Sequence, residues 1–490
     1  MSRRTAGLLL GLELALGLVL RLIDAGARPI WYDDAFSVFL SRGNLASIVR
    51  GTAADTMPPL YYFLLHLWMT LTSSIAGWRL LGALLGVATI AAAFALALRL
   101  FDVRVALVTG FFVAVSPLQI YQAQELRMYT LMTLGLALYA WGVAEAWQSP
   151  QARRLWPWAI VVVGGLVAAY SHNLAVFTLI APDAFFLAKR QWGFLRRLLL
   201  AQLVMGILMI PWLVVVPGQI AKIQAAFWTP RPGVLEVLQA LLLFHGYLPL
   251  PAAGQVVLLT ASLMAVVLTA FVLMHASEGE GVGFLVVLLA VPPLLLFVAS
   301  YVMRPVFVPR AFMTSALAYL MLAAAAVVRA KAAVVRFALA GCILLAAAVS
   351  LPAQYAYRSF PRSPFAGAAG YLESQVGPGA VVVHDNKLSY FPTAVYAPQL
   401  EQSFLPDEPG SHNDTLAPAT QKAMGIFPAS DLESAVRGAS TVYFVVFQRA
   451  IDEYKAGGAA DHPQLIWLRH HYSQEQLTRF GDLLVYVFSN

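Results

Sequence analysis

Asp33 and Asp34 are adjacent carboxylates in a chain otherwise rich in apolar residues. They lie in the segment 28–38, directly after an apolar run long enough to span a bilayer. Charge near a bilayer is costly, so an acidic pair at its surface indicates a functional site; the alternative is a solvated loop that happens to be acidic. Asp33 is a candidate general base, because a neighbouring carboxylate and partial burial would raise its proton affinity. Asp34 could act as a second catalytic carboxylate or complete a metal site.

A second polar segment, residues 119–129, lies between two apolar runs and is rich in Gln, Glu, Arg and Tyr. On a continuous helix, Tyr121, Glu125 and Tyr129 would share one face because they are four residues apart. Glu125 could act with the acidic pair as a third catalytic carboxylate. Arg127 could pair with a carboxylate or bind phosphate.

Two further arginines, Arg304 and Arg310, lie in the polar segment 301–310. Together with Arg127 they are the candidates for binding a donor phosphate, because a guanidinium presents a fork of donors that matches phosphate oxygens. Arg310 and Arg127 are the first candidates. The alternative is that these side chains simply extend to lipid headgroups.

Polar and aromatic residues beside these groups are the candidates for contacting substrate. They are Tyr61, Tyr121, Gln124, Tyr129, His172, Asn173 and His245. A lone histidine at the end of an apolar run is more often a structural residue than a ligand, so both interpretations of His172 and His245 stay open. Carboxylates such as Asp33 and Glu125 suit Mg²⁺ or Mn²⁺, yet arginines could bind phosphate without a metal, so metal dependence stays open too. No glycine-rich phosphate loop occurs, and nucleotide-dependent chemistry is not expected.

The composition determines the setting of these residues. Sixty per cent of the residues are apolar, 12% are charged and the mean hydropathy is +0.72, whereas soluble domains have about 45–50% apolar and about 25% charged residues. Apolar runs of roughly 17–22 residues recur along the chain, each long enough to cross about 30 Å of hydrocarbon. These features predict a polytopic α-helical membrane protein. The net charge is +7, but the basic residues form no groove-like patch, so nucleic acid is not an expected partner.

About eleven spans are expected from the lengths of the apolar runs. They are residues 6–23, 78–99, 104–121, 128–147, 156–171, 174–188, 197–216, 254–274, 282–302, 311–328 and 336–353. Basic clusters near Arg99, Lys189 and Arg329 then fall on one side, which is expected to be cytoplasmic. The N-terminus lies on that side, and the acidic and arginine segments lie outside. The first span is expected to be retained, because Glu13 interrupts a would-be signal peptide.

Two apolar segments, 58–72 and 235–250, are too short to span and are expected to be amphipathic helices on the outer face. Charges, prolines and glycines return near Gln354. The expected domains are a membrane domain, 1–353, whose first outer loop is 24–77, and an extracytoplasmic domain, 354–490. Within the second domain, strands are predicted at 379–384, 440–447 and 482–488, and helices at 365–376 and 429–436. This alternation is typical of a small α/β domain.

Several ordered motifs in about the first 175 residues resemble those of the GT-C glycosyltransferases. They are Trp31-x-Asp-Asp-Ala-x-Ser37, Asp55-x-x-Pro-Pro-Leu-Tyr-Tyr-x-Leu-Leu-His-Leu-Trp68, Arg79-Leu-Leu-Gly82 and Ser116-Pro-x-x-x-Tyr-x-x-Gln-Glu-x-Arg-Met-Tyr129. The pattern is similar to the family 39 type, which includes protein O-mannosyltransferases and the aminoarabinose transferase of lipid A. It departs from the family at three places: Asp-Asp replaces the common Asp-Glu, Met57 replaces a histidine before Pro-Pro, and Arg310 is followed by Ala instead of Tyr.

The resemblance implies transfer of a sugar from a polyprenyl-phosphate donor on the outer side of the bacterial cell (inner) membrane. The acceptor would be a lipid, a glycan or a protein, with Asp33 as the base toward its hydroxyl and Asp34 orienting it. Membrane lipid would surround the donor's tail. The competing hypothesis is a transporter or lipid-handling protein whose carboxylates bind protons or ions. That hypothesis predicts structural repeats, and the sequence contains no internal repeat, so the resemblance favours a glycosyltransferase.

Overall fold

The structure is a computed structural model that describes residues 2–149, 154–225, 229–247, 249–276, 279–408 and 415–490. Its residues separate into two compact units. The first comprises Met1–Gly26 and Asp55–Tyr355, and the second comprises Ala27–Ala54 and Ala356–Asn490. The segment 27–54, which the sequence analysis placed in the membrane domain, therefore groups with the C-terminal residues. Each unit is described by itself below.

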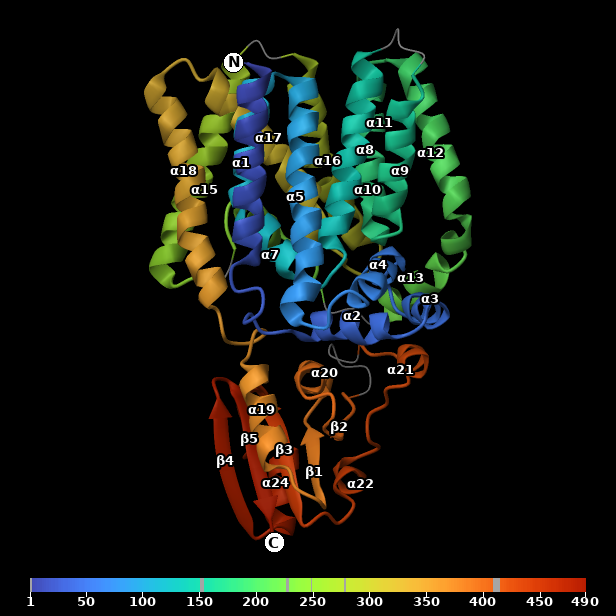
Figure 1. Cartoon of the computed structure of the whole chain (residues 1–490), viewed down its shortest axis with the longest axis vertical. Coiled ribbons are helices and arrows are strands. Elements are labelled where there is room, and N and C mark those ends of the chain that lie inside the picture. The colour runs from blue at the N-terminus through green and yellow to red at the C-terminus, as the bar shows by residue number, and fades with distance from the viewer. Residues whose placement is uncertain (1, 150–153, 226–228, 248, 277–278, 409–414) are drawn as a thin grey trace. The chain divides into compact units, whose positions relative to one another are not determined.

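The first unit is a bundle of helices and makes the protein a multi-pass membrane protein (Figure 1). Among the described residues, seven helical segments are long and apolar enough to cross a bilayer. They are α1 (Arg3–Leu22), α5 (Ile75–Leu100), α12 (Trp192–Leu213), α15 (Ala252–His275), α16 (Glu280–Val302), η2 with α17 (Pro309–Arg329) and α18 (Ala333–Ala356). An eighth is the pair α6 (Val103–Val115) and α7 (Pro117–Gln124), which is bent by 53°.

The remaining expected spans also fall on helices. They correspond to α8 (Tyr129–Gln148), α9 (Trp156–Ala169) and the run of η1 (Asn173–Ala175), α10 (Val176–Leu179) and α11 (Ala181–Ala188). The segments from α9 to α11 are shorter apolar helices, so length and composition support seven or eight of the eleven expected spans.

Three short helices lie at the ends of the longer ones: α4 (Leu60–Met69), α13 (Val216–Ala225) and α14 (Val234–Leu243). The prediction of short helices at 58–72 and 235–250 is confirmed by α4 and α14, each of ten residues. A helix of that length rises only about 15 Å, half of the hydrocarbon thickness.

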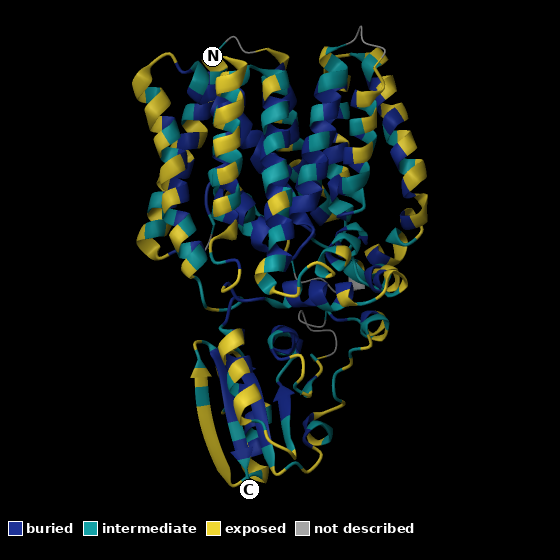
Figure 2. Cartoon of the chain, viewed as in Figure 1, coloured by how far each residue is buried: buried dark blue, intermediate teal, exposed yellow. Residues whose placement is uncertain are grey.

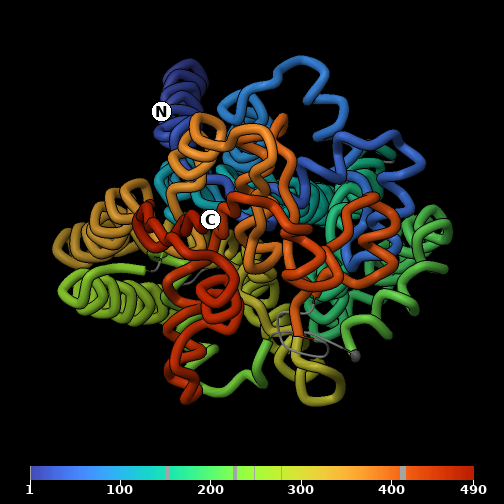
Figure 3. Tube along the Cα trace, turned by 90° about the horizontal axis from the view of Figure 1, so that it is seen from below, coloured from blue at the N-terminus to red at the C-terminus, as the bar shows by residue number. Residues whose placement is uncertain are grey.

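Burial differs strongly among the long helices (Figure 2). In the helix formed by η2 and α17, 89% of the most apolar 18-residue stretch is buried, whereas the corresponding share is 11% in α1 and 28% in α18. The exposed apolar side chains of the outer helices suit contact with lipid. At one edge, α15 and α18 pack side by side through Leu258 and Ala346, as Figures 1 and 3 both show.

The second unit contains a five-stranded mixed sheet with strand order β2-β1-β3-β5-β4. The strands are β1 (Ala380–His384), β2 (Gln402–Phe404), β3 (Thr441–Phe447), β4 (Gln474–Phe480) and β5 (Leu483–Ser489). β1 pairs in parallel with β2 and β3, and β5 pairs antiparallel with β3 and β4. The predicted strands correspond to β1, β3 and β5, so the expected α/β character of this region is present.

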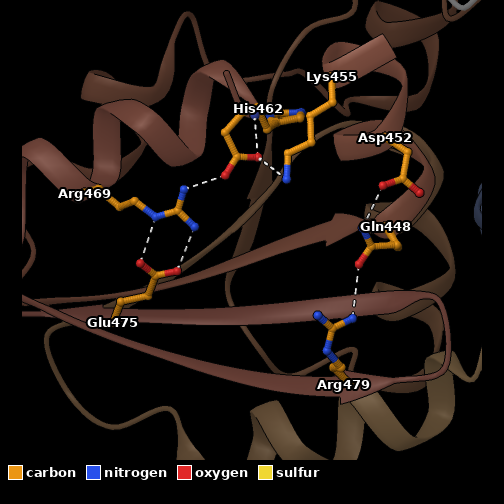
Figure 4. Close-up of polar contacts among 8 residues, drawn as sticks. Gln448, Asp452, Lys455, His462, Arg469, Glu475 and Arg479 are labelled. Carbon is orange, nitrogen blue, oxygen red and sulfur yellow. Dashed lines mark hydrogen bonds and ion pairs between the residues drawn. The ribbon is translucent and has the colours of Figure 1, made fainter. Parts of the chain in front are cut away.

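Helices pack on the sheet of the second unit. They are α19 (Phe365–Gln375), α20 (Lys387–Tyr396), α22 (Leu432–Val436), α23 (Gln448–Ala456) and α24 (Pro463–His471). A further helix, α21 (Pro418–Met424), packs on α3 (Leu45–Ala54) instead. The edge strand β4 is mostly exposed and is tied to its surroundings by polar contacts (Figure 4). Arg469 of α24 binds Glu475 of β4 through two hydrogen bonds of 2.8 and 2.9 Å. Such exposed ion pairs stabilise a protein by only about 0–1 kcal/mol.

The segment 27–54 forms α2 (Tyr32–Arg42) and α3 (Leu45–Ala54), which pack on helices of the same unit. The main-chain N–H of Ile30 donates to the Tyr396 hydroxyl at 3.0 Å. The ring of Phe391 on α20 lies 5.3 Å from the rings of both Tyr32 and Phe39, measured between centroids. The acidic motif is thus carried by helices that share a core with the C-terminal domain.

Candidate functional site

The two aspartates stand in the first turn of α2. Carboxylates are favoured there because the helix N-terminus carries a partial positive charge. Successive residues of a helix point about 100° apart, since the helix has 3.6 residues per turn. Asp33 and Asp34 therefore face different surroundings, and the structure separates their roles.

Asp34 is completely buried in an ion pair. Its Oδ2 accepts a hydrogen bond of 2.7 Å from Nη1 of Arg362, whose side chain is 3% exposed. The same oxygen accepts from the main-chain N–H of Trp31 at 3.3 Å, and Arg362 also donates to the Pro29 carbonyl at 2.8 Å. Asp34, predicted as a catalytic carboxylate, thus fixes the entrance of α2 to the residues that follow α18.

Asp33 keeps a partly exposed side chain. Its main-chain carbonyl accepts a hydrogen bond of 3.0 Å from the Ser37 hydroxyl, one turn further along α2. Of the two aspartates, Asp33 is the one with access to solvent, as a general base needs.

In the first unit, the segment that carries Glu125 and Arg127 is a turn and not a helix. α7 ends at Gln124, Glu125 has an extended backbone with φ −80° and ψ 141°, and α8 begins at Tyr129. The expectation that Tyr121, Glu125 and Tyr129 share one helix face is therefore wrong. The helical spacing argument fails because the helix ends before Glu125.

Five side chains of the first unit gather around this turn. The Arg310 guanidinium lies over the Tyr129 ring at 5.4 Å, and the His172 ring lies 5.4 Å from the same ring. Arg127 is buried, and its Nη1 lies 3.5 Å from the Tyr62 hydroxyl. We call Tyr62, Arg127, Tyr129, His172 and Arg310 the cationic cluster. Two guanidinium groups this close to aromatic and hydroxyl groups can hold an anion with several oxygens.

His172 is uncharged within the cationic cluster. Burial, together with the positive charges of Arg310 and Arg127, lowers the pKa of His172 to about 3. Its neighbour Asn173 donates from Nδ2 to the Thr56 carbonyl at 2.9 Å and to Oε1 of Gln219 at 2.8 Å. The turn at 170–173 is thus held against the segment before α4 and against α13.

The other predicted site residues make contacts elsewhere in the first unit. Tyr121 stacks on Tyr247 with ring centroids 3.8 Å apart. Nε2 of His245 lies 2.7 Å from the hydroxyl of Tyr319 on α17, and burial lowers the pKa of His245 to about 4. These contacts connect α7 to the segment that follows α14, and that segment to α17.

Three further predicted site residues of the first unit, Tyr61, Gln124 and Arg304, contact other parts of that unit. Tyr61 is buried and packs edge-on against Tyr62, with ring centroids 5.8 Å apart. Gln124 donates to main-chain carbonyls at the end of α1. Arg304 is bonded through its main-chain N–H and its Nη1 to Gln224 of α13, at 3.1 and 3.3 Å.

Several residues near the cationic cluster were not predicted. Lys222 of α13 pairs with Asp55 at 3.0 Å, and Gln219 of the same helix binds Asn173. Asp55 and Tyr62 belong to a motif recognised in the sequence, but their roles depend on partners far away in the chain. Tyr62 has the same residue type as its neighbour Tyr61, so the sequence could not distinguish them.

The described residues contain no group of three or more His, Cys, Asp or Glu side chains arranged to hold a cation. Asp33 and Glu125, the expected ligands, belong to different units. The chemistry proposed below therefore relies on Arg127 and Arg310.

Residues 56–215 match the family model described as Dolichyl-phosphate-mannose-protein mannosyltransferase. This stretch includes α4, the turn at 125–128 and His172, and it ends directly before α13. No curated protein matches the chain.

Solved structures share the fold. ArnT from Cupriavidus metallidurans in the apo state is 16% identical, with a TM-score of 0.64 over 99% of this chain and 98% of that chain. The same enzyme bound to undecaprenyl phosphate is 15% identical, with a TM-score of 0.62 over 97% of each chain. The Archaeoglobus fulgidus oligosaccharyltransferase tethered to an acceptor peptide is 13% identical, with a TM-score of 0.54 over 100% of this chain and 74% of that chain.

Proposed function

We propose that this chain is a membrane glycosyltransferase of the GT-C superfamily, which transfers a sugar from a polyprenyl-phosphate donor to an acceptor hydroxyl. Transfer takes place on the extracytoplasmic side of the inner membrane. The N-terminus is cytoplasmic and the second unit is extracytoplasmic. The acceptor is a lipid, a glycan or a protein.

The cationic cluster is the observation that carries this proposal. The Arg310 guanidinium lies over the Tyr129 ring, and the positive charges of both Arg127 and Arg310 act on His172. A buried cationic site with no described carboxylate group arranged for a metal suits a phosphate monoester or diester. The structures of ArnT with undecaprenyl phosphate and of the archaeal oligosaccharyltransferase with dolichol phosphate agree with a lipid phosphate as ligand.

The proposed reaction is a direct displacement with inversion. The acceptor oxygen attacks the anomeric carbon of the sugar, and the bond from that carbon to the phosphate oxygen breaks. The acceptor proton passes to Asp33, and the electron pair of the broken bond stays on the lipid phosphate. Arg127 and Arg310 stabilise the charge that develops there, because preorganised cations are most effective in a site that excludes water.

Asp33 is proposed as the base because it is the partly exposed member of the acidic pair. Asp34 cannot take this role without breaking its buried ion pair with Arg362. Glu125, at the end of α7, is proposed to orient the substrate near Arg127.

The test is transfer from radiolabelled polyprenyl-phosphate mannose and arabinose by the purified full-length protein. Membrane lipid extract and a cell-wall fraction serve as acceptors, and nucleotide sugars serve as control donors. Transfer from the lipid donors is expected, with loss in Asp33→Asn and retention in Glu433→Gln, which removes an exposed carboxylate of α22. Absence of transfer and of donor hydrolysis by folded protein would overturn the proposal and favour a transporter.

A further inference from the structure

His172 is placed in the cationic cluster by a short, strongly anchored turn. It precedes η1 as its N-cap residue. The Tyr170 carbonyl accepts a hydrogen bond of 3.1 Å from the main-chain N–H of Leu60, at the start of α4. Asn173 binds two further partners, so the turn is tied to α4, to the segment before it and to α13. The position of the imidazole is therefore set by backbone structure on both sides.

The same turn determines the tautomer of His172. Its Nδ1 accepts a hydrogen bond of 3.0 Å from the main-chain N–H of Leu174. A nitrogen that accepts a hydrogen bond carries no proton, so a neutral imidazole must carry its proton on Nε2. The part of the chain that the structure describes provides no hydrogen-bond partner for that Nε2–H.

The imidazole is also kept neutral. It is buried, and the positive charges of Arg310 and Arg127 add to the effect of burial, so its pKa falls to about 3. A third cation beside two guanidinium groups would be repelled. A neutral N–H donor supplies a further hydrogen bond to an anion without that repulsion.

We propose that His172 binds the phosphate of the lipid donor through a fixed, neutral Nε2–H. This inference rests on the proposed function and names a residue of the same site. A phosphate oxygen is the matching ligand atom, because it accepts hydrogen bonds and lies where the two arginines direct negative charge. His172 is then a binding residue and not an acid or base, since its Nδ1 is already occupied and Nε2 has no lone pair to take a proton.

Three substitutions of His172 distinguish the role of its Nδ1 from that of its Nε2–H. His172→Asn keeps an oxygen acceptor for the Leu174 N–H, because asparagine is a favoured N-cap residue, but has nothing in place of Nε2–H. His172→Gln extends an amide donor toward the position of Nε2. His172→Ala removes both functions. The control is His384→Asn, which removes another buried histidine, in the second unit.

The measurement is the affinity of the detergent-solubilised full-length protein for undecaprenyl phosphate and for uncharged undecaprenol, from pH 5 to 8. In His172→Asn we expect affinity for the phosphate to fall by roughly tenfold or more, as for loss of a hydrogen bond to a charged group. Binding of undecaprenol and the unfolding temperature should stay near those of the unaltered protein. His172→Gln should recover part of the affinity for undecaprenyl phosphate. Between pH 5 and 8, titration of His172 should add no pH dependence to this affinity.

Two results would overturn the inference: unchanged phosphate affinity in His172→Asn, or an equal loss for undecaprenol, which would indicate a purely structural role. The binding assay needs no sugar transfer. Phosphate binding that depends on His172 without any transfer would therefore refute the proposed function alone. Transfer that is unaffected in His172→Asn would refute the role of His172 alone.

Discussion

Gln124 of α7 caps the end of α1, and Arg21 of α1 caps the end of α6 in the first unit. The Gln124 amide donates to the main-chain carbonyl of Arg21 at 3.2 Å and to that of Ile23 at 2.8 Å, at the end of α1. The Arg21 guanidinium donates to the carbonyls of Ala114 and Val113 at 3.1 and 3.3 Å, at the end of α6. This reciprocal contact joins α1 to the bend between α6 and α7.

The bend between α6 and α7 explains why the hydrogen bonds from Arg21 are needed. Carbonyl groups at a helix end have no partner within the helix, and hydrocarbon supplies none. A fully buried arginine within a span is costly and needs a reason. Arg21 supplies the missing donors, so α7 can leave the axis of α6 and carry the turn with Glu125 and Arg127.

Arg21→Met should therefore weaken the bend. Two carbonyls of α6 lose a charged donor, and each such hydrogen bond contributes about 1.5–3 kcal/mol. We expect a lower unfolding temperature in detergent and weaker binding of lipid phosphate. Gln124→Leu removes only neutral hydrogen bonds and should cost less, about 1 kcal/mol. An Arg21→Met protein as stable as the unaltered one would contradict this assignment.

Gly82 of α5 should tolerate no side chain. A Cβ at this position would lie 2.3 Å from the carbonyl oxygen of Ala123, which belongs to the backbone of α7. Gly82→Ala must push α7 away, at a cost of about 1–3 kcal/mol, and should reduce sugar transfer. Gly206→Ala is the matched control, because a Cβ there meets nothing within 4 Å. Equal activity and stability of both variants would show that α7 is not packed as described.

The two aspartates of α2 should respond differently to the same change. Asp34→Asn leaves the buried Arg362 charge without its partner, which typically costs about 3–5 kcal/mol. Asp33→Asn should leave the unfolding temperature nearly unchanged and abolish transfer. Replacing both partners, as Asp34→Leu with Arg362→Met, should recover part of the stability. The unfolding temperature and the transfer rate of each variant check this, and loss of transfer at full stability in Asp34→Asn would argue against a structural role for Asp34.

The second unit should lose stability in acid through His384. Burial lowers the pKa of this residue from 6.5 to about 4. The folded state therefore binds the proton less readily than the unfolded state, so the contribution to stability is complete above pH 6.5 and is lost as the pH falls toward 4. The loss amounts to about 3 kcal/mol over this range.

Thermal unfolding of the full-length protein between pH 7.5 and 4.5 measures this effect. His384→Asn should show a shallower dependence on pH than the unaltered protein, because the group that takes up the proton is gone. Identical slopes for the two proteins would mean that His384 is already protonated in the folded state.

Chelation of divalent cations should leave sugar transfer largely intact. The proposed site neutralises the leaving phosphate with Arg127 and Arg310, and the described residues offer no group of three metal-binding side chains. The check is the transfer rate after treatment with EDTA, with and without added Mg²⁺ or Mn²⁺. An activity that is lost with EDTA and returns with Mn²⁺ would assign Asp33 or Glu125 to a metal instead.

The sequence by itself determined the membrane setting and most of the elements. A run of apolar residues must be helical in hydrocarbon to satisfy its backbone, so length and hydropathy located the helices and even distinguished α4 and α14 as too short to span. Buried strands rich in valine and phenylalanine located β1, β3 and β5. β4 was missed because its residues are mostly exposed and polar, and β2 because it has only three residues.

Only the tertiary structure decided what the chemical groups do. Asp33 and Asp34 are alike in sequence, and Arg362, which separates their roles, lies 328 residues beyond Asp34. The cationic cluster likewise brings together side chains from distant segments: α4, the turn after α7, the start of α8, the residue before η1, and η2. Because α7 ends at Gln124, Arg127 lies in a turn and not on the helix face that spacing alone would give it. Such contacts depend on packing between distant segments, whereas hydropathy and spacing report only on residues that are close in the chain.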